Sequence, residues 1–125
     1  MNNIELKTHF IHGLSNKARL TILELLKSKE MTVNEIVKQS QISQSSISQH
    51  LACLKGSGLV NSRQEGKYVY YQVKNNQILE LLKLIDSVVE DTEDDIERKE
   101  NIKPSLVNQI LLIVFCFLWY IFHIL

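Results

Sequence analysis

The sequence is poor in cysteine, with two residues in 125. Cys53 and Cys116 lie far apart, so they give neither a disulfide framework nor a closely spaced zinc motif. The N-terminal residues 1–10 lack an unbroken apolar run, so we expect no signal peptide and a reducing, cytoplasmic location. The chain also lacks a Ser/His/Asp arrangement, a phosphate-binding loop and paired carboxylates, so we expect no enzyme.

The formal net charge of zero conceals an uneven distribution of charge. Residues 1–74 carry ten Lys and Arg against five Asp and Glu, whereas residues 75–125 carry four against nine. A basic body favours an anionic partner, and an acidic segment does not. If the partner is DNA, the first 74 residues are therefore the part that binds it.

Apolar residues at helical spacing predict two helices near the N-terminus. The first covers about residues 4–14, and Ser15 is the expected N-cap of the second. The buried face of the second helix is expected to contain Ala18, Ile22, Leu25 and Leu26. Its outer face is expected to carry Lys17, Arg19 and Lys27.

Two further helices follow after a short break. Thr32 and Glu35 have the spacing of a capping box, which predicts a third helix over residues 33–39. Ser43 is the expected N-cap of a fourth helix, with Ile47, Leu51 and Leu54 at helical spacing. Glycines at 56 and 58 end it, since glycine tolerates the left-handed conformation found there.

A hairpin and a fifth helix complete the predicted body. Residues 59–64 and 67–74 favour strands, and Glu65-Gly66 between them is a tight-turn signal. From about Asn76 a helix carries an apolar stripe, made of Ile78, Leu81, Leu82, Ile85 and Val88 or Val89. The fold class is therefore mainly α with a small β-hairpin, in the order of a winged helix-turn-helix.

The fourth helix has the character of a DNA-recognition helix. The residues that we predict to contact DNA there are Gln44, Ser45, Ser46, Ser48, Gln49 and His50. None of them is a carboxylate, which phosphates would repel, and Gln and Ser can donate to and accept from base edges. Arg63 and Lys67, on either side of the turn, could grip the phosphate backbone or enter the minor groove. A polar surface helix and a solvated hairpin tip are the alternatives.

Three stretches resemble the ArsR/SmtB family of metal- and stress-responsive repressors. Residues 14–23 resemble its opening signature, residues 43–55 its recognition helix, and residues 58–71 its wing. The resemblance covers about residues 10–85 and implies a homodimer, paired through the first and fifth helices. It also implies operator binding that weakens when an inducer binds, often a soft or borderline metal ion.

The apolar stripe of the fifth helix favours a homodimer independently, because a small winged domain leaves it little core to cover. Two-fold symmetry in turn predicts an inverted-repeat operator in double-stranded DNA. The alternative is that the stripe folds back on its own domain.

Metal sensing is doubtful from the residues present. The third helix has no thiol, and residues 78–95 contain no histidine. Cys53 resembles the first of two cysteines in the cadmium- and lead-sensing branch, but Ser57 replaces the second, and serine is a poor ligand for a soft ion. Cys53 is therefore a weak metal candidate, with a buried small apolar side chain as the alternative. His9 and His12 with Glu5 are a second weak candidate, and no cofactor is required.

The last twenty residues, 106–125, are uncharged and almost wholly apolar. Such a helix matches the thickness of a bilayer core, so we expect a C-terminal transmembrane helix that tethers a cytoplasmic body to the membrane. The alternative is an extra dimer helix or a tail without function. The expected domains are residues 1–90 for DNA binding and dimerisation, an acidic linker at 91–105 and the tail.

Two functions follow. The first is a sequence-specific DNA-binding transcriptional repressor. The second is a membrane-anchored dimerisation or interaction module on a winged-helix scaffold that does not read DNA.

Overall fold

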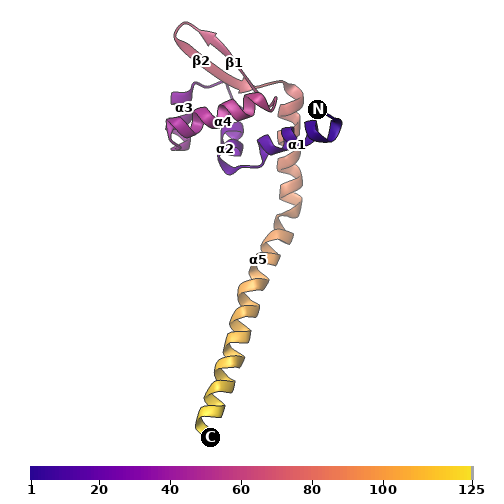
Figure 1. Ribbon diagram of the computed structural model, residues 1–125, viewed down its shortest axis with the longest axis vertical. Coiled ribbons are helices and arrows are strands. Elements are labelled where there is room, and N and C mark those ends of the chain that lie inside the picture. Colours follow the sequence, from indigo (N-terminus) through magenta and orange to yellow (C-terminus); the bar gives the residue numbers. More distant parts are fainter. Residues whose placement is uncertain (125) are drawn as a thin grey trace. The chain divides into compact units, whose positions relative to one another are not determined.

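The computed structural model of the chain describes residues 1–124, without the side chains of residues 94, 96 and 98–107 (Figure 1). The elements are α1 (Asn3–Leu14), α2 (Lys17–Leu26), α3 (Val33–Ser40), α4 (Gln44–Gly56), β1 (Val60–Glu65), β2 (Tyr68–Val73) and α5 (Asn76–Ile124). They form two compact units, Met1–Leu82 and Lys83–Leu125. The mainly helical fold with one two-stranded hairpin is confirmed.

Local capping starts the third and fourth helices at the expected residues. The Glu35 amide donates to Thr32 Oγ1 at 3.3 Å, and the Thr32 amide donates to Glu35 Oε2 at 3.1 Å. The Ser46 amide donates to Ser43 Oγ at 3.3 Å. Each bond satisfies an amide that the first helical turn leaves unpaired, so both predicted caps are confirmed.

The start of α2 differs from the prediction. Its N-cap is Asn16, whose Oδ1 accepts the Arg19 amide at 3.1 Å. Ser15 instead follows the end of α1, where its amide donates to the His12 carbonyl at 3.2 Å. Ser15 is the C-cap of α1, so α2 begins one residue later than expected and Asn16 is its N-cap.

Arg19 was expected on the outer face of α2, and this expectation is wrong. The side chain is 8% exposed, and it donates from Nε to the Gly13 carbonyl at 2.9 Å and from Nη2 to the His12 carbonyl at 2.7 Å. The last carbonyls of a helix lack intrahelical partners, and a guanidinium satisfies two of them at once. Arg19 therefore joins α1 to α2.

The core of the first unit lies between α2, α3, α4 and the hairpin base. Its fully buried apolar side chains include Ile22, Leu23, Ile36, Ile47, Leu51, Leu54 and Leu59. Ile78 and Leu82 of α5 belong to the same core. For these two residues the apolar stripe folds back on its own domain, as the alternative proposed, whereas Leu81 is half-buried.

The hairpin is antiparallel, with Arg63 opposite Tyr70 and Glu65 opposite Tyr68. Its turn lies one residue later than expected, because Glu65 is the last residue of β1 and Gly66 has a left-handed φ of 60°. Figure 1 shows the hairpin projecting from the helical part of this unit.

The second unit begins within α5. The apolar side chains between Ile110 and Ile124 that the structure describes are exposed, and the Trp119 and His123 rings stack at 4.4 Å. In the part of the chain with described side chains, no helix is both long and apolar enough to cross a membrane. The described residues therefore do not support the transmembrane helix that was expected at 106–125. Leu106, Val107 and Leu125 lie outside that part.

Candidate nucleic-acid interface

One side of α4 is polar and open to solvent. Ile47, Leu51 and Leu54 are fully buried and fix the opposite side against the core. Of the six predicted contact residues on this helix, Gln44, Ser45, Ser48 and Gln49 are exposed, and Ser46 and His50 are half-buried. The structure thus places four of them on the surface, and the other two at its margin.

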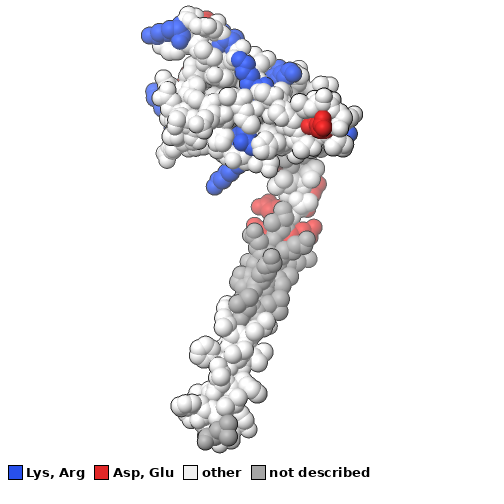
Figure 2. Space-filling model, in the orientation of Figure 1, with Lys and Arg blue, Asp and Glu red and all other residues white. Residues whose placement is uncertain are grey.

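The exposed side of α4 suits a polyanion that displays hydrogen-bonding groups. The helix sequence contains no carboxylate, so nothing on α4 itself repels phosphate. Its first turn presents backbone amides at the positive end of the helix dipole. In the view of Figure 2, Lys and Arg side chains are spread over the hairpin and the adjoining surface of the first unit, with few Asp or Glu among them.

The hairpin tip carries a cation on an aromatic ring. Lys67 is exposed in the turn, and its Nζ lies 5.3 Å from the centroid of the Tyr68 ring. Tyr68 is itself 49% exposed, and its ring lies 6.5 Å from that of Tyr70 on the same face of β2. Sequence reasoning selected Lys67 but missed Tyr68, which it treated only as a strand former. An aromatic residue directly after a basic turn residue was the available signal.

A hydrogen bond joins the C-terminal end of α4 to the hairpin. Lys55 Nζ donates to Ser62 Oγ at 2.8 Å. This contact spans from the last turn of the helix to the middle of β1, so it helps to fix the hairpin relative to α4. Sequence reasoning did not select Lys55, because its partner lies on a different element.

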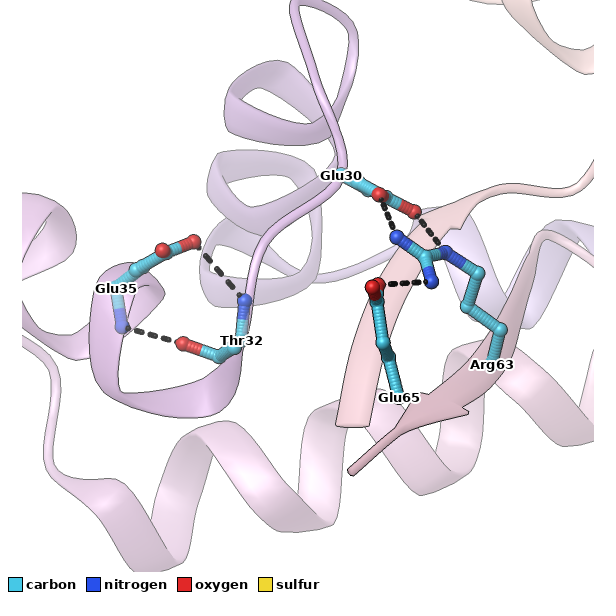
Figure 3. Close-up of polar contacts among 5 residues, drawn as sticks. All are labelled: Glu30, Thr32, Glu35, Arg63 and Glu65. Atoms are coloured by element: carbon cyan, nitrogen blue, oxygen red, sulfur yellow. Dashed lines mark hydrogen bonds and ion pairs between the residues drawn. The ribbon is translucent and has the colours of Figure 1, made fainter. Parts of the chain in front are cut away.

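Arg63 is engaged by carboxylates of its own chain (Figure 3). Its Nε donates to Glu30 Oε2 at 2.8 Å, its Nη2 to Glu30 Oε1, and its Nη1 to Glu65 Oε2 at 2.6 Å. The hydrogen bond from Arg63 lowers the pKa of Glu30 below its usual value, and the bonds from Glu30 and Glu65 raise the pKa of Arg63. The predicted phosphate contact therefore already has two anionic partners.

The candidate metal residues lie on two helices, with Glu5, His9 and His12 on α1 and Cys53 on α4. Cys53 is half-buried, and Ser57, four residues later, is buried against Gly13 of α1. Glu5 accepts the Asn2 amide at 2.9 Å, as part of the capping box of α1. Across the residues that the structure describes, no group of three or more His, Cys, Asp or Glu side chains could hold a metal ion.

The His9 ring contacts the end of the helix that contains Cys53. His9 Nε2 lies 3.2 Å from the Gly56 carbonyl at the C-terminal end of α4. This contact ties α1 to α4. His9 and His12 line the same surface hollow, together with Glu5.

The polar face of α4 beside a basic hairpin is the arrangement found in known DNA-binding regulators. A family model described as "Bacterial regulatory protein, arsR family" matches residues 16–62, which span α2 to β1. The nodulation protein NolR of Rhizobium meliloti is 31% identical over 81% of this chain and 83% of its own length. The chain belongs to the arsR family of bacterial regulatory proteins.

Two further proteins that are similar to this chain bear on its function and its fold. The transcriptional activator HlyU of Vibrio cholerae is 36% identical over 60% of this chain and 69% of its own. The homodimeric winged helix-turn-helix DNA-binding domain of Mb0332 from Mycobacterium bovis has a TM-score of 0.66 and 31% identity, over 72% of this chain and 82% of that one.

The arsR family consists of DNA-binding transcription regulators rather than enzymes, and this chain is such a regulator. The match covers the helix-turn-helix, which contains the predicted contact residues of α4, and the first half of β1. The roles of the individual residues, and the more specific likeness to the cadmium- and lead-sensing branch, stay predictions.

Proposed function

We propose that this arsR-family regulator acts as a homodimeric repressor, which places α4 of each subunit in the major groove of an inverted-repeat operator. The observation that carries the proposal is the exposed N-terminal half of α4, which is polar and free of carboxylates, in a unit whose hairpin turn carries the exposed Lys67. Bases are read by hydrogen bonds in the major groove, so a helix with these groups is suited to that task.

The exposed side chains of α4 divide between two tasks. Gln44 and Ser45, in the first turn, are close enough to the free backbone amides to contact phosphate together with them. Ser48 and Gln49, one turn further, would contact base edges, and glutamine can pair bidentately with adenine. The half-buried Ser46 and His50 would border the contact, and Lys67 of the hairpin turn would bind the phosphate backbone.

The dimer surface that we propose is an apolar hollow of about 440 Å³ on the first unit. It is lined by Leu6, Lys7, Phe10, Ile11, Leu14 and Leu81. Ile11 is 60% exposed, which is costly for so large an apolar side chain within a continuous patch. The homodimeric state of the Mb0332 domain supports a second copy of this chain as the group that covers it.

A dimer of this kind has its two recognition helices related by two-fold symmetry, which explains why the operator should be an inverted repeat. Occupation of such a site near a promoter would exclude polymerase, so we propose repression. The body would act in the cytoplasm, where bacterial DNA is held. Because one of the relatives is a transcriptional activator, repression and activation are distinguished by the reporter experiment described below.

The test is a selection of operator sequences from random duplex DNA by the full chain, followed by affinity measurements at fixed salt. The selected sites should contain an inverted repeat with half-sites about one helical turn apart. Gln49→Ala should relax selectivity at one base pair of each half-site, by about 1–3 kcal/mol per lost contact. Gln77→Ala, on the exposed start of α5, removes the same group outside α4 and should leave selectivity unchanged.

The second hypothesis from the sequence, an interaction module that does not read DNA, gives a different result in the same experiment. The full chain would then show no salt-sensitive binding to any duplex and enrich no sequence. Repression is tested separately, by reporter output from the selected operator with and without the regulator. A fall in output on removal of the protein would contradict repression and indicate activation.

A further inference from the structure

The loop between α2 and α3 is attached to the hairpin through its backbone. The Met31 amide donates to the Tyr71 carbonyl at 3.0 Å, and the Tyr71 amide donates to the Met31 carbonyl at 2.8 Å. Met31 is also 2% exposed, so its side chain anchors this point in the core. The preceding residue, Glu30, is thereby held beside the hairpin before any side-chain contact is considered.

Glu30 and Glu65 enclose the guanidinium of Arg63 from two sides (Figure 3). Glu30 binds it through both carboxylate oxygens, and Glu65 binds the remaining terminal nitrogen. The guanidinium also lies over the Tyr70 ring, with Cζ 4.8 Å from the ring centroid. We name Glu30, Arg63 and Glu65 the wing clamp.

The two carboxylates of the wing clamp bind Arg63 with the same geometry that a DNA phosphate would use. Arginine binds phosphate through two parallel N–H donors, and a bidentate carboxylate uses the same planar geometry. Two carboxylates against one guanidinium leave the cluster with a net negative charge. Arg63 is 43% exposed, so a phosphate can reach it only in competition with groups already in place.

Lys67 stands in contrast within the same hairpin. Lys67 is exposed at the tip, and among the described residues its ammonium group lies over the Tyr68 ring and not beside an anion. An ammonium on an aromatic face keeps its charge available to a phosphate. The hairpin therefore presents one available cation and one that the protein neutralises.

We propose that the wing clamp is an internal competitor for DNA phosphate: Glu30 and Glu65 keep Arg63 off the backbone, and so lower sequence-independent binding. The proposal rests on the proposed function, because it concerns how the wing meets DNA. Phosphate contacts strengthen binding to every sequence alike, whereas base contacts strengthen binding to the operator. Neutralising one wing cation therefore weakens binding to all DNA by a similar factor, so that base contacts make up a larger share of the binding free energy that remains. Glu30 is a positioning residue, since it acts through Arg63.

The experiment measures binding of the full chain to a random-sequence duplex by fluorescence anisotropy. The KCl concentration is varied from about 50 to about 200 mM, a range over which binding through phosphate contacts weakens steeply. Glu30→Gln should tighten binding and steepen the slope of log K against log salt by up to about 0.9 for each wing on the DNA, because Glu65 still holds one nitrogen of Arg63. Arg63→Gln should leave the wild-type slope unchanged. Lys67→Gln should make the slope shallower by about the same 0.9.

Three further variants separate release of Arg63 from a general change in charge. The double variant Glu30→Gln with Arg63→Gln should return to the wild-type slope, because no arginine is left to release. Glu65→Gln should steepen the slope as Glu30→Gln does, but less, since Glu65 makes one bond to Arg63 and Glu30 two. Glu24→Gln removes a carboxylate that is paired with Lys27 on α2, and should not change the slope.

Distinct results overturn the inference. If Arg63→Gln makes the slope shallower as Lys67→Gln does, Arg63 already binds phosphate and the clamp does not hold it. If the double variant keeps the steeper slope of Glu30→Gln, that slope comes only from the removal of a negative charge and not from the release of Arg63. A Glu30→Gln protein that binds more weakly, with an unchanged urea midpoint, would show that Glu30 merely supports the hairpin. Wild-type protein without salt-dependent binding would instead overturn the proposed function itself.

Discussion

Gly13 is a residue whose identity is set by a close approach between α1 and the chain after α4. A Cβ added there would lie 2.7 Å from Leu59 Cδ1 and 2.9 Å from Ser57 Cβ. Leu59 is fully buried and Ser57 is 7% exposed, so neither neighbour has space to retreat. The contact lets α1 pack beside the C-terminal end of α4.

We expect Gly13→Ala to lower the free energy of unfolding by about 1–3 kcal/mol, the usual cost of overpacking. Alanine favours a helix over glycine by about 1 kcal/mol, so the clash must exceed this gain for the sign to hold. Urea unfolding followed by circular dichroism measures the change.

Gly56→Ala is the matched control, because a Cβ at the end of α4 would meet nothing within 4 Å. It should leave stability unchanged or raise it by up to about 1 kcal/mol. Equal stability of the two alanine variants would contradict the packing account.

The residue contacts that could be predicted from the sequence are the local ones. The caps at Thr32 and Ser43 join groups three residues apart, so spacing alone indicates them. Arg19 was misplaced because its partners are backbone carbonyls at the end of another helix, which have no sequence signature. The pairing of Arg63 with Glu30 spans 33 residues and depends on the backbone bridge between Met31 and Tyr71.

At the scale of the element, the serines at and near the start of α4 have different surroundings. Ser43 Oγ accepts an amide of the first turn, whereas Ser48 is exposed within the helix. Loss of an N-cap hydroxyl costs about 1 kcal/mol, and an exposed substitution without such a bond changes stability by less than about 0.5 kcal/mol.

We therefore expect Ser43→Ala to lower stability by about 1 kcal/mol, and Ser48→Ala to leave stability unchanged but weaken operator binding. Urea unfolding and anisotropy on the selected operator, both applied to both variants, separate the two effects. The assignment fails if Ser48→Ala binds the operator as the wild type does.

The elements themselves were predictable where one face of a helix is buried in its own chain. The spacing of Ile47, Leu51 and Leu54 indicated α4 and its buried side. At the start of α5 a similar apolar stripe did not show whether it packs on its own domain or on a second subunit. Periodicity reveals an apolar face but not what covers it. Ile78 and Leu82 face the core of the first unit, while Leu81 lines the surface hollow.

At the scale of the whole molecule, the proposed reading of DNA depends on two copies of α4 held at one spacing. A single winged domain contacts one half-site, so loss of the dimer should remove most of the operator affinity. The proposed dimer surface contains Ile11, which is 60% exposed and makes little contact within its own unit. A substitution there can alter assembly without disturbing the core.

We expect Ile11→Glu to convert the protein to a monomer at concentrations where the wild type is a dimer. An isologous interface contains each residue twice, so one substitution introduces two carboxylates into an apolar contact. The dimer dissociation constant should rise by at least about tenfold, measured by analytical ultracentrifugation, and operator affinity should fall with it. Leu20→Glu, on α2 outside the hollow and 38% exposed, is the control and should remain dimeric. An Ile11→Glu protein that stays dimeric would place the two-fold axis elsewhere on the chain.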